Sequence, residues 1–172
     1  MKRIIATILS LLITPFALAC HHEDPNVEEI KATYQAYVDD FIKRDFNAIA
    51  THFQAPMMQR SAEGMIVSDT TEDIAQRYKQ YMDNIQDGYK YSTIDRLDVT
   101  KVADSLYYAD ADFTRFNSKD EVIYQGRSIY FFNNSDGAWK MFSMEEVERK
   151  NAILIPTKLD MVSLAQKGWV MQ

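Results

Sequence analysis

The stretch YKYSTIDRLDVTKVADSLYYADADFTRF, residues 89–116, sets the architecture that this sequence predicts. It holds two runs of alternating apolar and polar residues, separated by a turn near Ala103-Asp104. Two more runs follow, EVIYQGRSIYFF at residues 121–132 and AWKMFSMEEVE at residues 138–148, with the turn sequence NNSDG between them. Alternation with a period of two is typical of β-strands that bury one face. The four runs therefore predict a meander of antiparallel strands.

Amphipathic helices are predicted ahead of these strands. Asp24 suits the N-cap of the first helix and Pro25 its first position. A short second helix begins after Asp45 and is ended by Pro56. The apolar face of the first helix consists of Val27, Ile30, Tyr34, Tyr37, Val38, Phe41 and Ile42. The face of the second consists of Phe46, Ile49, Ala50 and Phe53.

A hairpin and a third helix connect this part to the strands. Residues 57–68 predict the hairpin, with Gly64 at its turn. The third helix begins in SDTTEDI and ends by Gly88. Its start offers two alternative capping boxes, Asp69 with Glu72 or Thr70 with Asp73.

Strand length predicts the shape of the sheet. Each run has about 11–14 residues, whereas an average strand has about 5–6, and long strands twist and curl. The expected fold is α+β: a cone-shaped roll of a strongly curved antiparallel sheet packed on three N-terminal helices. Residues 149–172 form an additional C-terminal extension, which we expect to be a helix over TKLDMVSLAQKGW.

Three stretches resemble the nuclear-transport-factor-2-like (NTF2-like) superfamily, which includes SnoaL-like cyclases and ketosteroid isomerase. They are IKATYQAYVDDFIKRDFNAIATHFQAP (residues 30–56), GMIVSDTTEDIAQRYKQYM (64–82) and FFNNSDGAWKMFSMEE (131–146). The resemblance implies a domain over residues 26–148 with a blind conical pocket between the sheet and the first helices. It implies no single activity, because this fold hosts many unrelated ones.

Residues 1–19 have the three parts of a bacterial secretory signal peptide. Lys2 and Arg3 begin it, an apolar run over residues 4–16 follows, and Ala17-Leu18-Ala19 resembles a cleavage site. We therefore expect an exported protein, located in the periplasm or anchored to the cell envelope by a lipid.

Cleavage after Ala19 would place Cys20 first, at the head of a flexible leader over residues 20–25. Two outcomes stay open. Cys20 can be lipidated, giving the only expected membrane contact, or it can keep a free amine. A free amine with His22 could hold Cu(II) or Ni(II), but a polar leader with no metal is the favoured interpretation.

Composition narrows the classes of partner. The formal charge is −6, and losing Lys2 and Arg3 with the signal would make it −8. An acidic chain is not suited to bind nucleic acid, whose phosphates require a basic surface. A single cysteine excludes an internal disulfide. We expect one domain with no cofactor, a small molecule of unknown identity as its partner, and a homodimer as an open alternative.

Strand alternation predicts which side chains face the pocket. On residues 105–116, Tyr107, Phe113 and Arg115 are assigned to the inner face, which leaves Asp110 and Asp112 outside. On residues 121–132 neither face is clearly apolar, and the set containing Arg127 is assigned inward. On residues 138–148 the inward set is Trp139, Met141, Ser143 and Glu145.

These assignments give the candidate site. The expected ligand-binding residues are Tyr34, Tyr37, Arg115, Arg127, Trp139, Ser143 and Glu145. For each of them a structural role, as an ion pair or a core aromatic, is the competing interpretation. The predicted function is non-catalytic binding of a small, largely apolar ligand. One alternative is an isomerase, cyclase or dehydratase with Glu145 or Asp112 as general base and Tyr37 as donor. Another is a protein-interaction domain that pairs through the outer sheet face.

Overall fold

Three helices precede most of the sheet in the computed structural model, which describes residues 24–61 and 64–147. They are α1 (Pro25–Lys43), α2 (Phe46–Thr51) and α3 (Thr71–Asp83). As predicted, Asp24 caps α1 by accepting a hydrogen bond from the backbone N–H of Asn26. Of the two alternative capping boxes of α3, the structure contains the one formed by Thr70 and Asp73.

Six strands form one sheet in the order β2-β1-β6-β5-β4-β3. Their bounds are β1 (Phe53–Ser61), β2 (Gly64–Ser68), β3 (Tyr89–Ala103), β4 (Leu106–Asn117), β5 (Val122–Asn133) and β6 (Lys140–Glu146). The antiparallel meander from β3 to β6 and the hairpin β1–β2 are confirmed. The sequence did not predict that β1 pairs with β6 in parallel and so joins the hairpin to the meander. Phe53 belongs to β1, so its assignment to the second helix is wrong.

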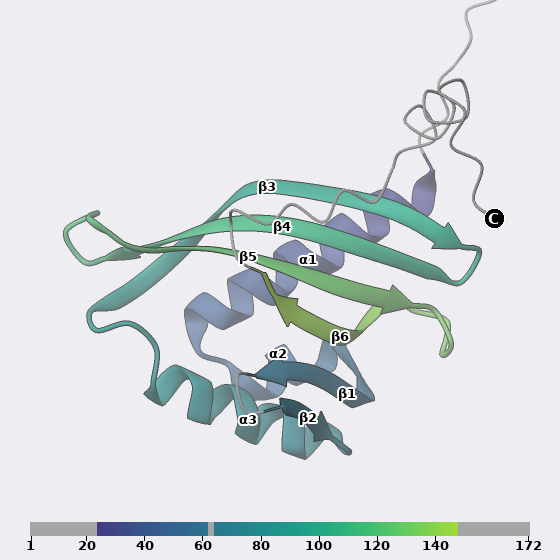
Figure 1. Cartoon of the computed structure of the whole chain (residues 1–172), viewed down its shortest axis with the longest axis horizontal. Helices are drawn as coiled ribbons and strands as arrows, with labels where there is room; N and C mark the ends of the chain where they lie inside the picture. Colours follow the sequence, from purple (N-terminus) through teal and green to yellow (C-terminus); the bar gives the residue numbers. More distant parts are fainter. Residues whose placement is uncertain (1–23, 62–63, 148–172) are drawn as a thin grey trace, which may run out of the picture.

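The long strands β3, β4 and β5 arch over α1, while α2 and α3 lie near β1 and β2 (Figure 1). The predicted α+β class and curved sheet are therefore confirmed. Between the layers lies an aromatic core in which Tyr34 and Tyr130 meet edge to face, with centroids 5.1 Å apart. Tyr37 and Phe53 meet in the same way at 5.5 Å. Such pairs add about 0.5–1.5 kcal/mol each beyond the burial of their area.

The predicted signal peptide, Cys20, His22 and the C-terminal extension lie outside the described residues. None of the three described helices is long and apolar enough to cross a membrane.

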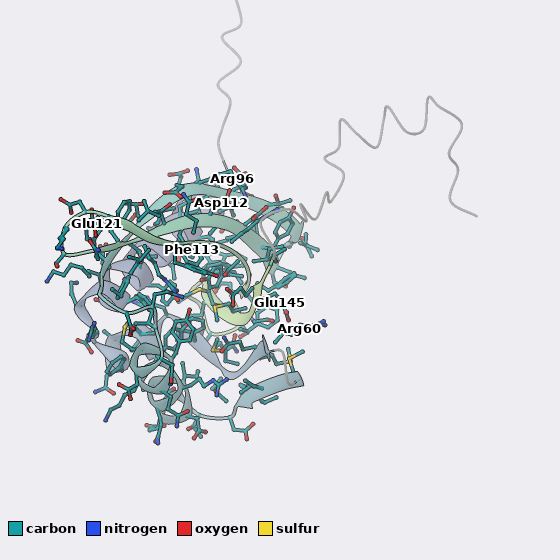
Figure 2. The ribbon with its side chains drawn as sticks, turned by 60° about the vertical axis from the view of Figure 1, so that its left-hand side comes forward. Arg60, Arg96, Asp112, Phe113, Glu121 and Glu145 are labelled. Atoms are coloured by element: carbon teal, nitrogen blue, oxygen red, sulfur yellow. The ribbon has the colours of Figure 1, made fainter. Side chains whose placement is uncertain are left out.

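On β4 the predicted alternation is confirmed. Tyr107, Ala109 and Ala111 belong to the core, and Asp110 and Asp112 lie on the opposite, outer face. In Figure 2, Arg96 and Asp112 lie together on the outer side of the sheet, where Arg96 Nε donates to Asp112 Oδ2 over 2.8 Å.

On β5 the predicted alternation is wrong. Tyr130 and Phe132 face the helices as part of the core. Arg127 therefore lies on the outer face, where its Nε donates to Asp110 Oδ1 over 2.8 Å. The outer face is itself partly apolar and includes the buried Ile129, so apolarity could not distinguish the two sides of this strand.

On β6 the prediction is right at the start of the strand and wrong beyond a bulge. Trp139 and Met141 are buried in the core. The register with β5 then shifts, because Phe132 pairs with Met141 but Phe131 pairs with Ser143. The extra residue reverses the alternation, as bulges do. Ser143 and Glu145 consequently lie on the outer face, and Glu145 forms an ion pair with the exposed Arg60 at 3.3 Å (Figure 2).

Candidate functional site

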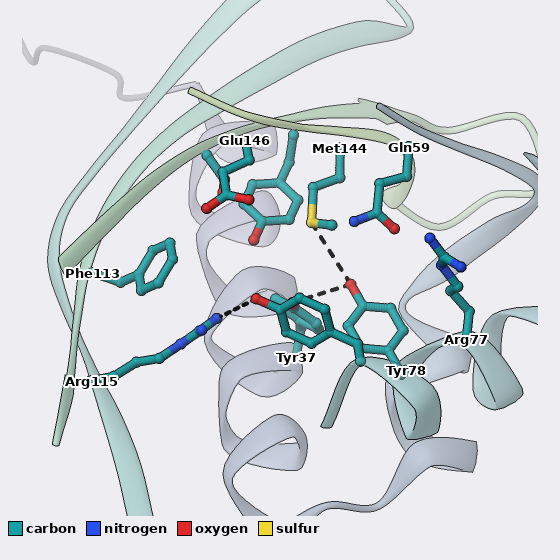
Figure 3. A pocket seen from close by; sticks show the side chains of 11 residues that line it. Tyr37, Gln59, Arg77, Tyr78, Phe113, Arg115, Met144 and Glu146 are labelled. Carbon is teal, nitrogen blue, oxygen red and sulfur yellow. Dashed lines mark hydrogen bonds between the residues drawn. The ribbon is translucent and has the colours of Figure 1, made fainter. Parts of the chain in front are cut away.

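A cavity of about 40 Å³ lies on the concave side of the sheet, between α1, α3 and the strands (Figure 3). A second cavity of about 30 Å³ shares Tyr37, Phe113, Arg115 and Tyr130 with it. A single water needs about 10–15 Å³ of such space, so the first cavity has room for a few small groups. It is lined by Tyr37, Gln59, Arg77, Tyr78, Tyr81, Phe113, Arg115, Ser128, Tyr130, Met144 and Glu146.

Two tyrosines at helical positions form the floor of this cavity. The Tyr78 hydroxyl donates to the Tyr37 hydroxyl over 3.2 Å and also lies 3.9 Å from the sulfur of Met144. Burial raises the pKa of Tyr37 and of Tyr78 well above the usual tyrosine value. Both hydroxyls therefore stay protonated at physiological pH and serve as neutral hydrogen-bonding groups.

Arg115 supplies a buried positive charge at one side of the cavity. The residue is only 5% exposed. Its Nη1 donates to Gln86 Oε1 over 2.6 Å, and its Nη2 donates to the Tyr81 hydroxyl over 2.8 Å. Five aromatic rings surround the guanidinium, with centroids 5.0–5.9 Å from Cζ. They belong to Phe41, Tyr81, Tyr89, Phe113 and Tyr124.

Gly126 makes room for one of these rings. It pairs with Phe113 across β4 and β5, and the Phe113 ring lies over it on the inner face. A Cβ at position 126 would come within 2.3 Å of Phe113 Cζ. The glycine thus lets Phe113 form a wall of the cavity.

Glu146 is the one carboxylate among the described residues that line this cavity. It is exposed, and it accepts a hydrogen bond from the Tyr124 hydroxyl. Arg77 and Gln59 lie on the other side of the cavity from Glu146 (Figure 3). Sequence reasoning missed Glu146 because strict alternation placed it outside, and no residue in SMEE signals the bulge that turns it inward.

The structure brings together only some of the predicted site residues. Tyr37 and Arg115 line the cavity, and Tyr34 lines the smaller one beside it. Trp139 lies elsewhere in the core, where its Nε1 donates to Asn26 Oδ1 over 3.1 Å. The other four, Arg127, Ser143, Glu145 and Asp112, lie on the outer face.

The outer-face charges form a compact network. Asp110 Oδ1 accepts from Arg96 Nη2 at 3.0 Å and from Arg127 Nε at 2.8 Å. Although burial by itself would raise it, the hydrogen bonds from Arg127 and Arg96 hold the pKa of Asp110 below its usual value. Asp112 accepts from Arg96. Arg127 therefore takes part in a structural ion pair, which was the competing interpretation of this residue.

No three His, Cys, Asp or Glu side chains within residues 24–61 and 64–147 are grouped so that they could hold a metal ion.

A curved sheet that encloses a small cavity against α1 and α3 defines the NTF2-like class. The chain belongs to the family described as NTF2-like protein (DUF6841), whose profile matches residues 28–149. This confirms the predicted superfamily. No curated protein matches the chain.

Solved structures share the fold at low sequence identity. A domain of unknown function with a cystatin-like fold from Nostoc punctiforme is 14% identical, with a TM-score of 0.60 over 87% of this chain and 89% of that one. Aln2 from a Streptomyces species is 17% identical, with a TM-score of 0.60 over 74% and 94%. A ketosteroid isomerase-like protein from Erwinia carotovora atroseptica is 12% identical, with a TM-score of 0.55 over 73% and 99%.

Proposed function

We propose that this protein binds a small, largely apolar molecule in its conical pocket without converting it chemically. The observation that carries the proposal is the cavity itself, in which the aromatic and apolar side chains of Tyr37, Phe113 and Met144 stand beside charged and polar ones. Ligand sites are typically concave and mostly apolar, with a few convergent polar groups that orient the ligand. Pockets that hold drug-sized ligands measure about 300–1,000 Å³. The cavity of about 40 Å³ therefore favours a ligand of only a few heavy atoms.

The positions of the carboxylates favour binding over catalysis. A general base must lie within hydrogen-bond reach of the proton it removes. The predicted bases, Glu145 and Asp112, are engaged on the outer face by Arg60 and Arg96. Glu146 does line the pocket, but it lies at the exposed opening and is held by Tyr124.

Ligand-observed NMR with a library of small fragments tests this proposal. Ser128 lines the cavity and is 5% exposed, whereas Ser143 is 8% exposed on the outer face. The variant Ser128→Leu fills the cavity, and Ser143→Leu is its matched control. We expect fragment signals with the wild-type chain that are lost in Ser128→Leu and retained in Ser143→Leu, with both variants checked for folding by circular dichroism. Signals that persist in Ser128→Leu would show that fragments bind elsewhere, and the proposal would fail.

We further propose that the protein is exported, with Cys20 either lipidated or free at the mature amino terminus. The support is the signal-peptide pattern of residues 1–19. Intact mass spectrometry of the protein from bacterial envelopes separates the cases. A mass raised by a diacylglyceryl group and an acyl chain indicates the lipid anchor, whereas a mass that retains residues 1–19 contradicts export.

A second candidate role is pairing of two copies through the outer sheet face. The partly exposed rings of Phe131 and Phe142 lie there, with centroids 6.3 Å apart, beside Tyr108. Apolar side chains on a protein surface can mark protein contacts, and these half-buried rings would lie at the centre of such an interface. Sedimentation of the full chain should then show a dimer that Phe131→Glu dissociates. A wild-type chain that stays monomeric at about millimolar concentration, well above typical dissociation constants, contradicts this role.

A further inference from the structure

We propose that Arg115 binds a carboxylate group of the ligand, so that the pocket takes a short monocarboxylic acid with an apolar body. This inference rests on the proposed function and names the class of molecule that it holds. Three features of Arg115 support it: the lack of an ion pair with any described residue, an N–H donor with no acceptor among those residues, and the cavity beside the guanidinium.

The Arg115 guanidinium is a buried cation for which the described residues provide no anionic partner. Arg115 is 5% exposed, yet no carboxylate among the described residues forms an ion pair with it. Its two hydrogen bonds go to neutral acceptors, the Gln86 amide and the Tyr81 hydroxyl. An isolated buried charge is strongly unfavourable unless an opposite charge compensates for the lost hydration. Arg127 is almost equally buried and shows the usual solution, because it pairs with Asp110.

One donor of Arg115 is left unused. Its buried Nε has no hydrogen-bond acceptor within the part of the chain that the structure describes. The five surrounding rings stabilise the positive charge through their faces, but they offer no oxygen to the N–H group. A buried N–H that stays unpaired is destabilising, because it has given up its hydrogen bond to water without replacing it. A carboxylate is the anion whose planar, two-oxygen geometry matches a guanidinium edge.

The rest of the lining is suited to the same ligand. The Tyr81 hydroxyl accepts from Arg115, which leaves its own proton for an oxygen of the ligand. Arg77 also faces the cavity and makes no ion pair with any described residue, whereas Glu146 is bonded to Tyr124. The cavity lining therefore contains two positively charged side chains, Arg77 and Arg115, and one carboxylate, Glu146. Phe113 supplies an apolar wall for an alkyl body, and the volume of about 40 Å³ keeps that body short.

Paired acid and amide probes test the inference on the full-length mature chain. Acetate and propionate carry the carboxylate, while acetamide and propionamide have nearly the same shape without the charge. Binding measured by isothermal titration calorimetry at constant ionic strength should be at least tenfold tighter for each acid than for its amide. Inorganic phosphate should bind more weakly than propionate, because the aromatic walls do not solvate a dianion.

Variants of Arg115 test whether this residue causes the preference for acids over amides. Arg115→Met should abolish the preference for acid over amide, and Arg115→Lys should reduce it, because lysine keeps the charge but not the two-pronged edge. The matched control Arg60→Met removes an exposed positive charge outside the pocket and should leave the preference unchanged.

The outcomes separate this inference from the proposed function. Equal affinity of acids and amides for the wild-type chain overturns the inference whether or not any variant folds. Retention of the preference in Arg115→Met, or phosphate binding as tight as propionate, overturns it as well. Fragments that bind wild type but not Ser128→Leu, without preferring acids, leave the proposed function standing and remove only the role of Arg115.

Discussion

Asp110 on the outer face of the sheet offers the sharpest test of the energetics. Replacing it with asparagine preserves the shape of the side chain and removes the negative charge beside Arg127. Both partners are shielded, with side chains 7% (Arg127) and 13% (Asp110) exposed. Removing one partner of a buried pair costs about 3–5 kcal/mol, because the attraction between the charges is lost while the cost of burying the other one remains.

The lower end of that range applies to Asp110→Asn. The amide oxygen can still accept one hydrogen bond, and Arg96 keeps Asp112 as a partner. We therefore expect a loss of about 3 kcal/mol in the free energy of unfolding. At about 2–4 °C per kcal/mol for a chain of this size, the melting temperature should fall by about 6–12 °C.

Urea unfolding at pH 7, followed by circular dichroism, measures this loss within a double-mutant cycle. The second variant is Arg127→Met, and the third combines both substitutions. Replacing both partners of a buried pair by neutral groups is often close to neutral. The double variant should therefore be more stable than the sum of the single losses predicts, by about 2 kcal/mol.

A control and a clear contrary result complete the test. Asp98 also pairs with Arg96, but its side chain is 65% exposed, so Asp98→Asn should cost less than about 0.5 kcal/mol. If Asp110→Asn costs less than about 1 kcal/mol, or if the two single losses simply add, the network does not stabilise the sheet as a buried pair.

Three further predictions concern stability. Because the folded-state pKa of Asp110 is lowered, its contribution should be constant between pH 7 and 5 and vanish as the pH falls through that pKa, below about 3.9. If the difference in free energy of unfolding between wild type and Asp110→Asn grows as the pH falls, this prediction is contradicted. Gly126→Ala should cost about 1–3 kcal/mol in urea unfolding, since the new Cβ would overlap the Phe113 ring, and an unchanged midpoint would show that the ring moves freely. Thr70→Ala should cost about 1 kcal/mol by removing the cap from α3, while Thr70→Ser should retain most of it; equal losses would disprove the capping role.

Much of the fold could be predicted from local patterns. The N-cap at Asp24, the capping box at Thr70 and the alternation along β4 each depend on residues close together in sequence. Long alternating runs with tight turns restrict the sheet to a curved meander. The pairing of β1 with β6 was not predictable in this way, because it joins residues about 90 positions apart through backbone groups that any sequence carries.

The candidate site was predicted only where alternation is unbroken. Tyr37 and Arg115 lie on α1 and on β4, whose patterns are regular, and both were correctly assigned to the interior. Arg127 was misplaced because a buried arginine on the outer face depends on Asp110 from the neighbouring strand. Glu145 and Glu146 exchanged places because of one bulge.

By itself, the sequence determined the helices, the long strands and the family, since these follow from periodic burial and from capping groups within a few residues. The tertiary structure alone determined which polar groups meet inside the cone. Packing between strands distant in sequence decides which side chains point inward beyond a bulge. It also decides which residue pairs with a buried charge. For that reason, only the folded structure shows that Arg115 Nε has no acceptor among the described residues.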